Sequence, residues 1–523
     1  MKRFYTGVFA ILFLSFSIVA QQSLSEDIAF KIKREAFQNS QLEDLAFLLT
    51  DFAGPRLAGS KLAERGEQIA KEKLIELGFS NVRIEKAADF HRGGWDNLKT
   101  YTAMTAPYYS SLTALPKAWS GSTNGLIKGD VILLEIKKPE DISNYKGKLA
   151  NKIVLMPEMY KYTIRFSPLA RRYTDEQLEE LTIDSRVQSL NQRVTSSTNN
   201  ISETLLQQIR SFLADEKPAV IIEGRGSFNV PSSTRLSNSS YKYGDPEPIA
   251  ELVLPIEAHA RMVRLITKKI PVSMEVDIKN EFYNNQIINN VIAEIPGTDP
   301  KLKDEVVLIG AHLDSWHGGT GAADNSSGCM VMMEALRIIK ETGVKPRRTI
   351  RVALWGGEEQ EGMMGSRGYM QKYLYNVEEN KPRKGYDQFA LYLNMDNGSG
   401  RFRGIFLEEN DMAFPFFRQW KKSLESLGFD ILSPHANGGT DHVSFARIGL
   451  PAFQFIQDPL EYLRSYHTLM DTYERLLLTD LQYNAAVVAL LTLSASMDDD
   501  KIPPKPLSSS TDGVTNSLIH ILM

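Results

Sequence analysis

The sequence predicts an α/β protein: a mostly parallel central sheet with helices on both faces, and a β-rich module inserted into it. Three observations lead to this prediction. From residue 290 onward, continuous apolar runs alternate with helical stretches, which is typical of parallel strands covered on both faces. Residues 25–79 instead show amphipathic helical periodicity. Between these parts, residues 106–280 contain short β-rich runs separated by turns. With 523 residues, the chain has room for two or three domains.

The first twenty residues, MKRFYTGVFAILFLSFSIVA, have the layout of a cleaved secretory signal. A short basic start precedes an apolar stretch, and Ala20 stands before the polar QQSLSED, although Ile18 is bulkier than is usual near a cleavage site. An uncleaved membrane anchor is the alternative. No later segment approaches twenty consecutive apolar residues, so we expect no stable membrane span in the mature chain. The expected location is secreted or periplasmic, and the sequence does not separate the two.

The overall charge gives no reason to expect a nucleic acid or an anionic membrane as partner. Lys and Arg together number 60 against 64 Asp and Glu, a formal net charge of −4. Cys329 is the only cysteine, so no internal disulfide is available and the core must supply the stability. Because it lies in the apolar stretch CMVMMEALRII, we interpret it as a buried packing residue.

The predicted organisation follows the chain in five parts. Residues 1–20 are the signal, and residues 21–105 are the first part of the main domain, with helices, the loop GPRLAGS and the strand NVRIEKA. The inserted module is assigned to residues 106–280. Its predicted strands are GDVILLEI, NKIVLM, PAVIIEG and VSMEVDI, with a polar helical stretch over 174–214.

The second part of the main domain is assigned to residues 281–497. Its predicted strands are VVLIGAHLD, TIRVALW, FALYLNMD and GLPAFQFI, and its helices include SSGCMVMMEALRIIKETG, FRQWKKSLESLG and a closing helix over 481–497. The tail over 498–523, which begins DDDKIPPKPLSSSTDG, is polar and proline-rich, so we expect it to be flexible.

Acids and imidazoles follow the predicted strands of this second part, at the sheet edge where sites form in such folds. The candidates are His312, Asp314, Asp324, Glu358, Glu359, Asp396 and His467. Imidazole nitrogen and carboxylate oxygen are donors that zinc accepts, and five residues can hold two zinc ions if one carboxylate bridges them. Asp324 is the candidate bridge. Taken singly, each residue has an ordinary alternative, since an Asp before a helix often only caps it.

The motifs AHLDS, GAADN, LWGGEEQEG, NMDNG and YHTLMDT, in this order, resemble those of a di-zinc exopeptidase family. That family includes secreted bacterial aminopeptidases, carboxypeptidase Q and the glutamate carboxypeptidases. The stretch GPRLAGS, the overall length and the mid-chain module are most similar to the carboxypeptidase Q branch, which carries an inserted protease-associated domain. The resemblance therefore implies a zinc exopeptidase fold with a protease-associated domain over 106–280.

By motif position, the resemblance also implies a role for each site residue. One zinc would be held by His312, Asp324 and Asp396, and the second by Asp324, Glu359 and His467. Glu358 would be the general base for the bridging water. Neighbouring side chains on an extended chain point to opposite sides, so the adjacent glutamates of LWGGEEQEG would divide these tasks.

Further residues have supporting roles in this hypothesis. Asp314 would accept a hydrogen bond from the far nitrogen of His312 and fix its tautomer. Tyr466 matches a position where some relatives have a tyrosine that donates to the oxyanion, although carboxypeptidase Q is not of that kind. Asp471 either orients the loop of His467 or caps the following helix.

The function implied is a secreted zinc-dependent exopeptidase that hydrolyses peptide bonds at a free terminus of short peptides or dipeptides. Relatives line the substrate pocket with the segment that contains Asp441 and His442. The prediction is an aminopeptidase or dipeptidase, and a carboxypeptidase is the alternative. A receptor-like homologue without metal, and a glutaminyl cyclase with a single zinc, are the rivals from other classes. The expected partners are peptide substrates, and a homodimer is an open alternative to a monomer.

Overall fold

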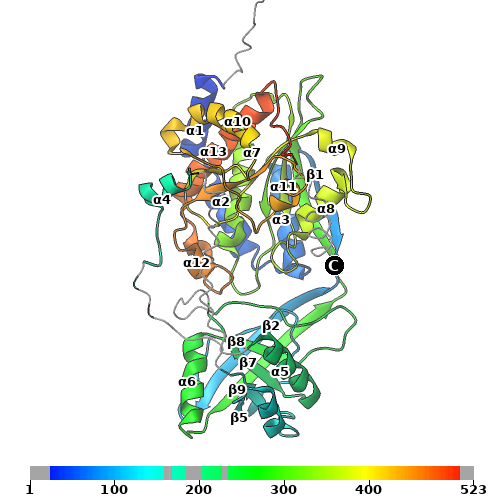
Figure 1. Cartoon of the computed structure of the whole chain (residues 1–523), viewed down its shortest axis with the longest axis vertical. Helices are drawn as coiled ribbons and strands as arrows, with labels where there is room; N and C mark the ends of the chain where they lie inside the picture. The colour runs from blue at the N-terminus through cyan, green and yellow to red at the C-terminus, as the bar shows by residue number, and fades with distance from the viewer. Residues whose placement is uncertain are drawn as a thin grey trace, which may run out of the picture.

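The computed structural model describes residues 24–157, 164, 166, 168–183, 202–226 and 234–506. Two eight-stranded sheets form two lobes, which lie one above the other in Figure 1. The predicted signal, residues 1–20, lies outside the described residues. Within the described ranges, none of the helices combines the length and the hydropathy that a bilayer crossing requires.

Helices precede the first sheet, as the periodicity of residues 25–79 predicts. They are α1 (Glu26–Gln38), α2 (Leu42–Phe47), the π-helical turn η1 (Leu48–Phe52) and α3 (Lys61–Glu76). The Oγ atoms of Ser25 and Ser60 accept hydrogen bonds from the first turns of α1 and α3, which fixes where these helices begin. The stretch GPRLAGS forms the loop between η1 and α3.

The main lobe is built on a sheet with the order β1-β10-β12-β11-β15-β18-β16-β17. In chain order its strands are β1 (Ser80–Asp89), β10 (Ile287–Ile295), β11 (Val306–His312), β12 (Thr349–Trp355), β15 (Phe389–Asn394), β16 (Phe402–Phe406), β17 (Ile431–Ser433) and β18 (Ala452–Gln457). The four central strands β12, β11, β15 and β18 are parallel, whereas β1, β10 and β16 pair antiparallel. The predicted α/β class is thus confirmed, with a parallel centre and mixed flanks.

Helices cover both faces of this sheet. On one face, α7 (Ser327–Glu341) and α13 (Leu478–Met497) pack with α1 on side chains such as Val307 and Ile309. On the other, α8 (Met364–Tyr373) and α11 (Val443–Ala446) pack on side chains that include Leu308. Residues 307, 308 and 309 of one strand therefore serve opposite cores, which explains why this strand is a continuous apolar run.

The second lobe, residues 94–283, is built on a sheet with the order β3-β2-β9-β5-β6-β7-β8-β4. Its elements are β2 (Gly94–Ala106), β3 (Ser110–Ser111), β4 (Leu115–Pro116), β5 (Ile127–Leu133), η2 (Pro139–Tyr145), β6 (Ile153–Leu155), α4 (Asp175–Glu180), α5 (Glu203–Glu216), β7 (Val220–Gly224), β8 (Ala250–Leu254), α6 (Ile256–Thr267) and β9 (Ser273–Tyr283). Strands β2 and β9 pair along their whole length. The predicted limits 106 and 280 therefore fall inside this sheet, because the polar first half of β2 lacks the apolar run that marks a strand.

The structure bears on two further sequence predictions. Of the helical stretch predicted over 174–214, α4 and α5 are helical, and residues 184–201 lie outside the described residues. The start of the tail, whose polar composition predicts flexibility, is packed in the structure: Asp498 and Ile502 are buried, and Trp420 Nε1 donates to Asp498 Oδ2 at 2.9 Å. The burial of these two side chains and the hydrogen bond from Trp420 hold this segment against the main lobe despite its polar composition. Residues 507–523 lie outside the described part.

Short elements complete the main lobe. They are η3 (Ala322–Ser326), β13 (Tyr375–Asn376), β14 (Lys381–Pro382), α9 (Lys384–Asp387), η4 (Asp411–Ala413), α10 (Phe414–Trp420), η5 (Lys421–Leu427), α12 (Tyr462–Ser465) and η6 (Tyr473–Arg475). Cys329 is fully buried in α7, as its apolar surroundings predict.

Candidate metal centre

The carboxyl ends of the central strands bring the predicted imidazole and carboxylate side chains together. His312 ends β11, the glutamate pair follows β12, and Asp396 follows β15. Asp324 lies in η3 just before α7, and His467 follows α12. Parallel strands converge their carboxyl ends at one edge, so residues far apart in sequence meet there.

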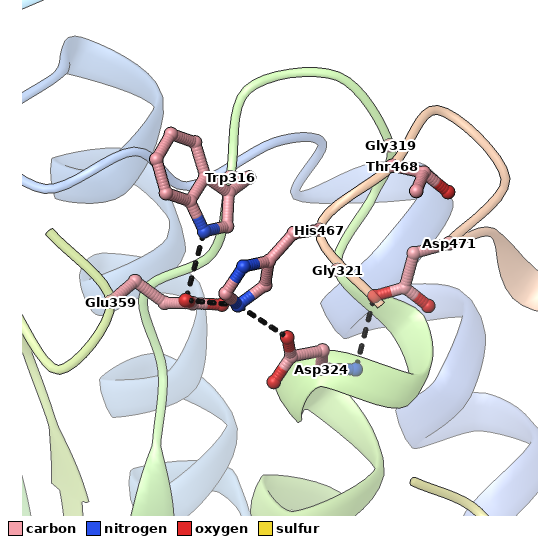
Figure 2. A pocket seen from close by; sticks show the side chains of 8 residues that line it. All are labelled: Trp316, Gly319, Gly321, Asp324, Glu359, His467, Thr468 and Asp471. Atoms are coloured by element: carbon pink, nitrogen blue, oxygen red, sulfur yellow. Dashed lines mark hydrogen bonds and ion pairs between the residues drawn. The ribbon is translucent and has the colours of Figure 1, made fainter. Parts of the chain in front are cut away.

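Asp324 stands between two imidazoles, with one carboxylate oxygen toward each. Its Oδ1 is 3.4 Å from His312 Nε2, and its Oδ2 is 3.3 Å from His467 Nε2. On the first side, Asp396 Oδ1 is 3.5 Å from His312 Nε2. On the second, Glu359 Oε2 is 2.7 Å from His467 Nε2, and Figure 2 shows His467 between Glu359 and Asp324. This is the arrangement that a carboxylate bridging two metal positions requires.

Two overlapping groups of side chains have their ligand atoms within 4.8 Å of one another. They are His312 with Asp324 and Glu359, and His312 with Glu358 and Asp396. Glu358 therefore lies at the same centre as the five predicted ligands, on the side of His312 and Asp396. The geometry places the two neighbouring glutamates on different sides of the centre.

The chemistry of these side chains fits a cation. His312 Nε2, Asp324 Oδ2 and Glu359 Oε1 are buried and make no hydrogen bond within the described structure, which is uncommon for buried polar atoms. Burial raises the pKa of Glu358 and of Glu359 well above the ordinary value. Such a cluster must either take up protons or hold a cation, and nitrogen and oxygen donors suit zinc.

Asp314 supports the centre through different atoms than the sequence predicts. The nearest acceptor for His312 Nδ1 is the main-chain oxygen of Asp314, at 3.0 Å, whereas Oδ1 is 3.7 Å away. The Asp314 carboxylate instead accepts from the main-chain N–H groups of Glu358 and Glu359, each at 3.1 Å. One residue thus fixes the imidazole orientation with its carbonyl and the turn of the glutamates with its side chain.

Asp471 connects the loop of His467 to the segment of Asp324. Its two carboxylate oxygens accept from the N–H groups of Ala323 and Asp324, at 2.7 and 3.0 Å, and the second contact is drawn in Figure 2. Burial and the neighbouring Asp324 raise its pKa to about 7. Of the two roles considered for Asp471, orientation of the site loops is the one its contacts match.

Two aromatic residues that touch the ligands are missing from the sequence prediction. Tyr462 donates from its hydroxyl to Asp324 Oδ1 at 3.1 Å and to Asp396 Oδ1 at 3.5 Å. Trp316 Nε1 donates to Glu359 Oε2 at 2.9 Å. Each lies within five residues of a motif residue, and neither belongs to a motif. The predicted Tyr466 lies beside them, with its ring stacked on His467 at 3.5 Å between centroids.

A cavity of about 440 Å³ opens beside the centre. The side chains that line it come from the site, from α12 and its flanks, and from the segment Asn437–Thr440. Neither lysine nor arginine is among its lining residues in the described part of the chain. A Cβ placed on Gly438 would meet nothing within 4 Å, so this part of the wall faces open space.

Asp441 and His442, predicted to contact substrate, are fully buried beneath this wall and do not line the cavity. His442 Nε2 lies 3.3 Å from Glu408 Oε1. The Glu408 carboxylate also accepts from the N–H of Asn437, at 3.1 and 3.2 Å. Burial raises the pKa of Asp441 to about 7. The neighbouring residues 437–440, rather than this pair, face the space that a substrate would fill.

Comparison with known proteins identifies relatives that cover most of the chain. Residues 290–492 match the sequence model described as Peptidase family M28. Carboxypeptidase Q of Mus musculus is 26% identical over 485 residues, which cover 91% of this chain and 91% of that protein.

Two solved structures share the fold. The crystal structure of a Peptidase M28 precursor from Shewanella amazonensis has a TM-score of 0.65 at 24% identity, and it covers 92% of this chain and 99% of its own. A zinc aminopeptidase from Bacillus subtilis has a TM-score of 0.52 at 18% identity, with coverages of 90% and 98%. Both similarities extend over the main and the second lobe, so the two-lobed architecture is shared.

Proposed function

Since residues 290–492 form a Peptidase family M28 domain, we propose that this protein is a zinc-dependent exopeptidase that removes residues from the free amino end of short peptides or dipeptides. The observation that carries the proposal is Asp324, whose two carboxylate oxygens face His312 and His467 separately. A carboxylate in this position can join two metal ions, and peptidases of the two-metal type use such a pair.

In this proposal, two zinc ions share the centre. His312, Asp324 and Asp396 hold one of them, and Asp324, Glu359 and His467 hold the other. When bound, the zinc ions polarise the scissile carbonyl and lower the pKa of a water molecule. The unsatisfied buried atoms of His312, Asp324 and Glu359 support this assignment, and so does the zinc-binding relative of the same fold.

Glu358 is the proposed general base. It lines the cavity next to the centre, and its main-chain N–H is fixed by the Asp314 carboxylate at 3.1 Å. A carboxylate there can accept a proton from water and deliver it to the leaving amine. Tyr466 lines the same cavity and remains the proposed donor to the oxyanion, while Tyr462 is engaged with two carboxylates.

The charges around the cavity favour the amino end of a peptide. Carboxylates line it, and neither lysine nor arginine is among its described lining residues. These carboxylates are the proposed zinc ligands and Glu358, so the preference rests on the described side chains of the wall, where an α-carboxylate finds no guanidinium or ammonium group as partner.

A carboxypeptidase is the second candidate, and one observation favours it. The guanidinium of Arg235 lies 5.1 Å from the centroid of the Tyr466 ring, and Tyr466 lines the cavity. A movement of this side chain would bring a cation to the substrate. The relative named carboxypeptidase Q, which spans most of the chain, points the same way.

Mass spectrometry of peptides with one end blocked distinguishes the two candidates. The mature protein is incubated with N-acetylated peptides, with C-terminally amidated peptides, and with free dipeptides, in the presence and absence of chelator. The proposal expects chelator-sensitive shortening of amidated peptides and no shortening of acetylated ones. The reverse pattern would establish the carboxypeptidase, and an absence of cleavage after zinc is restored would favour the receptor-like homologue.

We also propose that the protein is exported, because residues 1–20 have the layout of a signal peptide. Mass determination of the protein isolated from its native host tests this, with a mature chain that starts after Ala20 as the expected result. The assignment of the second lobe as a protease-associated domain and the homodimer both stay predictions, and light scattering of the purified chain tests the latter.

A further inference from the structure

The segment from Asp458 to Thr468, here called the ligand segment, carries His467 and Tyr462 but has little regular structure of its own. Its one short helix is α12, and Leu460 and His467 have positive φ angles of 41° and 56°. Residues other than glycine adopt this conformation at a cost, so their surroundings must hold it. The ligand segment is therefore expected to depend on contacts from outside.

The first contact comes from residues 171–173, which precede α4 of the second lobe. Arg171 N donates to Leu460 O at 3.0 Å in an antiparallel bridge, and Tyr173 N donates to Asp458 Oδ1 at 3.0 Å. In Figure 1, α4 lies at the height of the main lobe, apart from the helices α5 and α6 of its own lobe. Residues 171–173 therefore contact the main lobe directly.

Arg172 is the charged part of this contact. Its Nη1 donates to Asp458 Oδ2 at 2.8 Å and to Asp480 Oδ2 at 2.6 Å, and so connects the start of the ligand segment to α13. Asp458 is fully buried, and Arg403 Nη1, its other cationic neighbour, is 3.5 Å away. A buried carboxylate holds its position most firmly when its charged partner is close, so Arg172 anchors this end.

The second contact is made at the other end of the ligand segment. Leu236 N donates to the carbonyl oxygen of His467 at 2.9 Å, and Arg235 forms an antiparallel bridge with Thr468. Both Leu236 and Arg235 belong to the second lobe. The second lobe therefore contacts the ligand segment on both sides of Tyr462 and at the metal-facing residue itself.

We propose that the second lobe is a positioning element of the metal centre: residues 171–173 and 235–236 hold the ligand segment so that His467 meets Glu359 and Asp324. This inference rests on the proposed function insofar as the cluster must bind metal. It adds that the two metal positions depend on the second lobe to different degrees. His312 is the last residue of β11 and Asp396 lies two residues after β15, whereas His467 depends on the ligand segment.

The test is zinc binding by the full-length chain with Arg172→Ala, with Arg171→Ala as the matched control. Arg171 contacts Leu460 through its main chain, so its truncation leaves that contact intact, whereas Arg172→Ala removes the ion pairs with Asp458 and Asp480. Zinc content is measured against increasing chelator. In Arg172→Ala, one of the two zinc ions should be lost at a chelator strength about tenfold lower than in wild type, while Arg171→Ala retains both.

Hydrogen exchange of the ligand segment provides a readout that does not depend on metal. Amides of residues 458–468 should exchange faster in Arg172→Ala than in Arg171→Ala, and Arg172→Lys should restore most of the protection. Equal weakening of both zinc ions, or no difference from Arg171→Ala in either measurement, would overturn the positioning role. If wild type binds no zinc, the proposed function fails. The hydrogen-exchange comparison then still tests whether Arg172 holds the ligand segment, so the two failures are distinguished.

Discussion

The different roles proposed for Glu358, as general base, and Glu359, as zinc ligand, can be tested directly. Both residues have their main-chain N–H held by Asp314 at 3.1 Å, so a change of either side chain to glutamine leaves the backbone contacts equal. Glu359 Oε2 is 2.7 Å from His467 Nε2 and 2.9 Å from Trp316 Nε1. Glu358 belongs instead to the group of His312 and Asp396.

These contacts allow the loss of turnover and the loss of zinc affinity to be estimated for each variant. Glu358→Gln removes the proton acceptor, and loss of a general base costs about 10²–10⁴-fold in turnover, or about 3–5 kcal/mol of activation free energy. Zinc content should stay that of wild type. Glu359→Gln replaces an anionic donor that faces His467, so the affinity for one zinc should fall by at least the roughly 10–100-fold seen when an outer partner is lost.

The assay combines atomic absorption after dialysis with kcat on a dipeptide substrate, for both variants and wild type. Added zinc should rescue part of the activity of Glu359→Gln and none of that of Glu358→Gln. Equal zinc content in the two variants, with equal loss of turnover, would refute the assignment of different roles to the two glutamates.

Three further predictions follow from other parts of the structure. Asp324→Asn should weaken both zinc ions, which isothermal titration of the metal-free protein measures, and loss of only one would contradict the bridge. Arg56→Lys should weaken zinc binding by about tenfold, because Arg56 donates to groups on both sides of Asp324, whereas Arg348→Lys, an equally buried control, should lower only the melting temperature. Burial lowers the pKa of His259 to about 4 from 6.5. Between these two pH values, the imidazole is protonated in the unfolded chain and neutral in the folded one. Stability should therefore fall as the pH drops from about 6.5 toward 4, by up to about 3 kcal/mol, and His259→Gln should flatten this slope in urea titrations; an unchanged slope would contradict the assignment.

The sequence predicts where the buried parallel strands end, because each is a long apolar run that is followed at once by polar residues. His312 and Asp396 follow such runs directly, so both the strand and the site residue could be assigned. Asp324 and His467 lie on irregular segments; their residue types made them candidates, but the assignment of each to a metal position depended on the motif resemblance. The periodicity of a sequence carries no information about where an irregular segment folds back.

The contacts that hold the ligands were less predictable for a related reason. The sequence predicts a supporting role for Asp314, yet its carboxylate accepts from the N–H groups of the glutamate turn, and its main-chain carbonyl is the acceptor nearest to His312 Nδ1. Side-chain type suggests what a residue can bind, but the main-chain groups within its reach depend on the turn that follows the strand. The sequence does not single out Tyr462, because a tyrosine four residues before Tyr466 is compatible with many positions in a helical turn. Only the folded structure brings its hydroxyl to the carboxylates of Asp324 and Asp396.

The contacts of Arg56 show why the first loop of the chain matters for the site. Its guanidinium is fully buried and donates to Leu313 O at 2.6 Å, to Thr320 O at 2.7 Å and to Ser326 Oγ at 2.7 Å. These acceptors flank the strand end of His312 and the irregular turn of Asp324. A lysine has the same charge but cannot present several N–H groups in a planar fork, so it cannot satisfy three separated acceptors at once.

The supports of the centre are therefore unequal. His312 and Asp396 are placed by the central strands themselves, Asp324 by Arg56 and Asp471, and His467 by the second lobe. A side chain at the end of a packed strand loses little when a distant contact breaks, whereas one on an irregular segment moves with its supports. The position that includes His467 should accordingly empty first under chelation, at a denaturant concentration that leaves the central sheet intact.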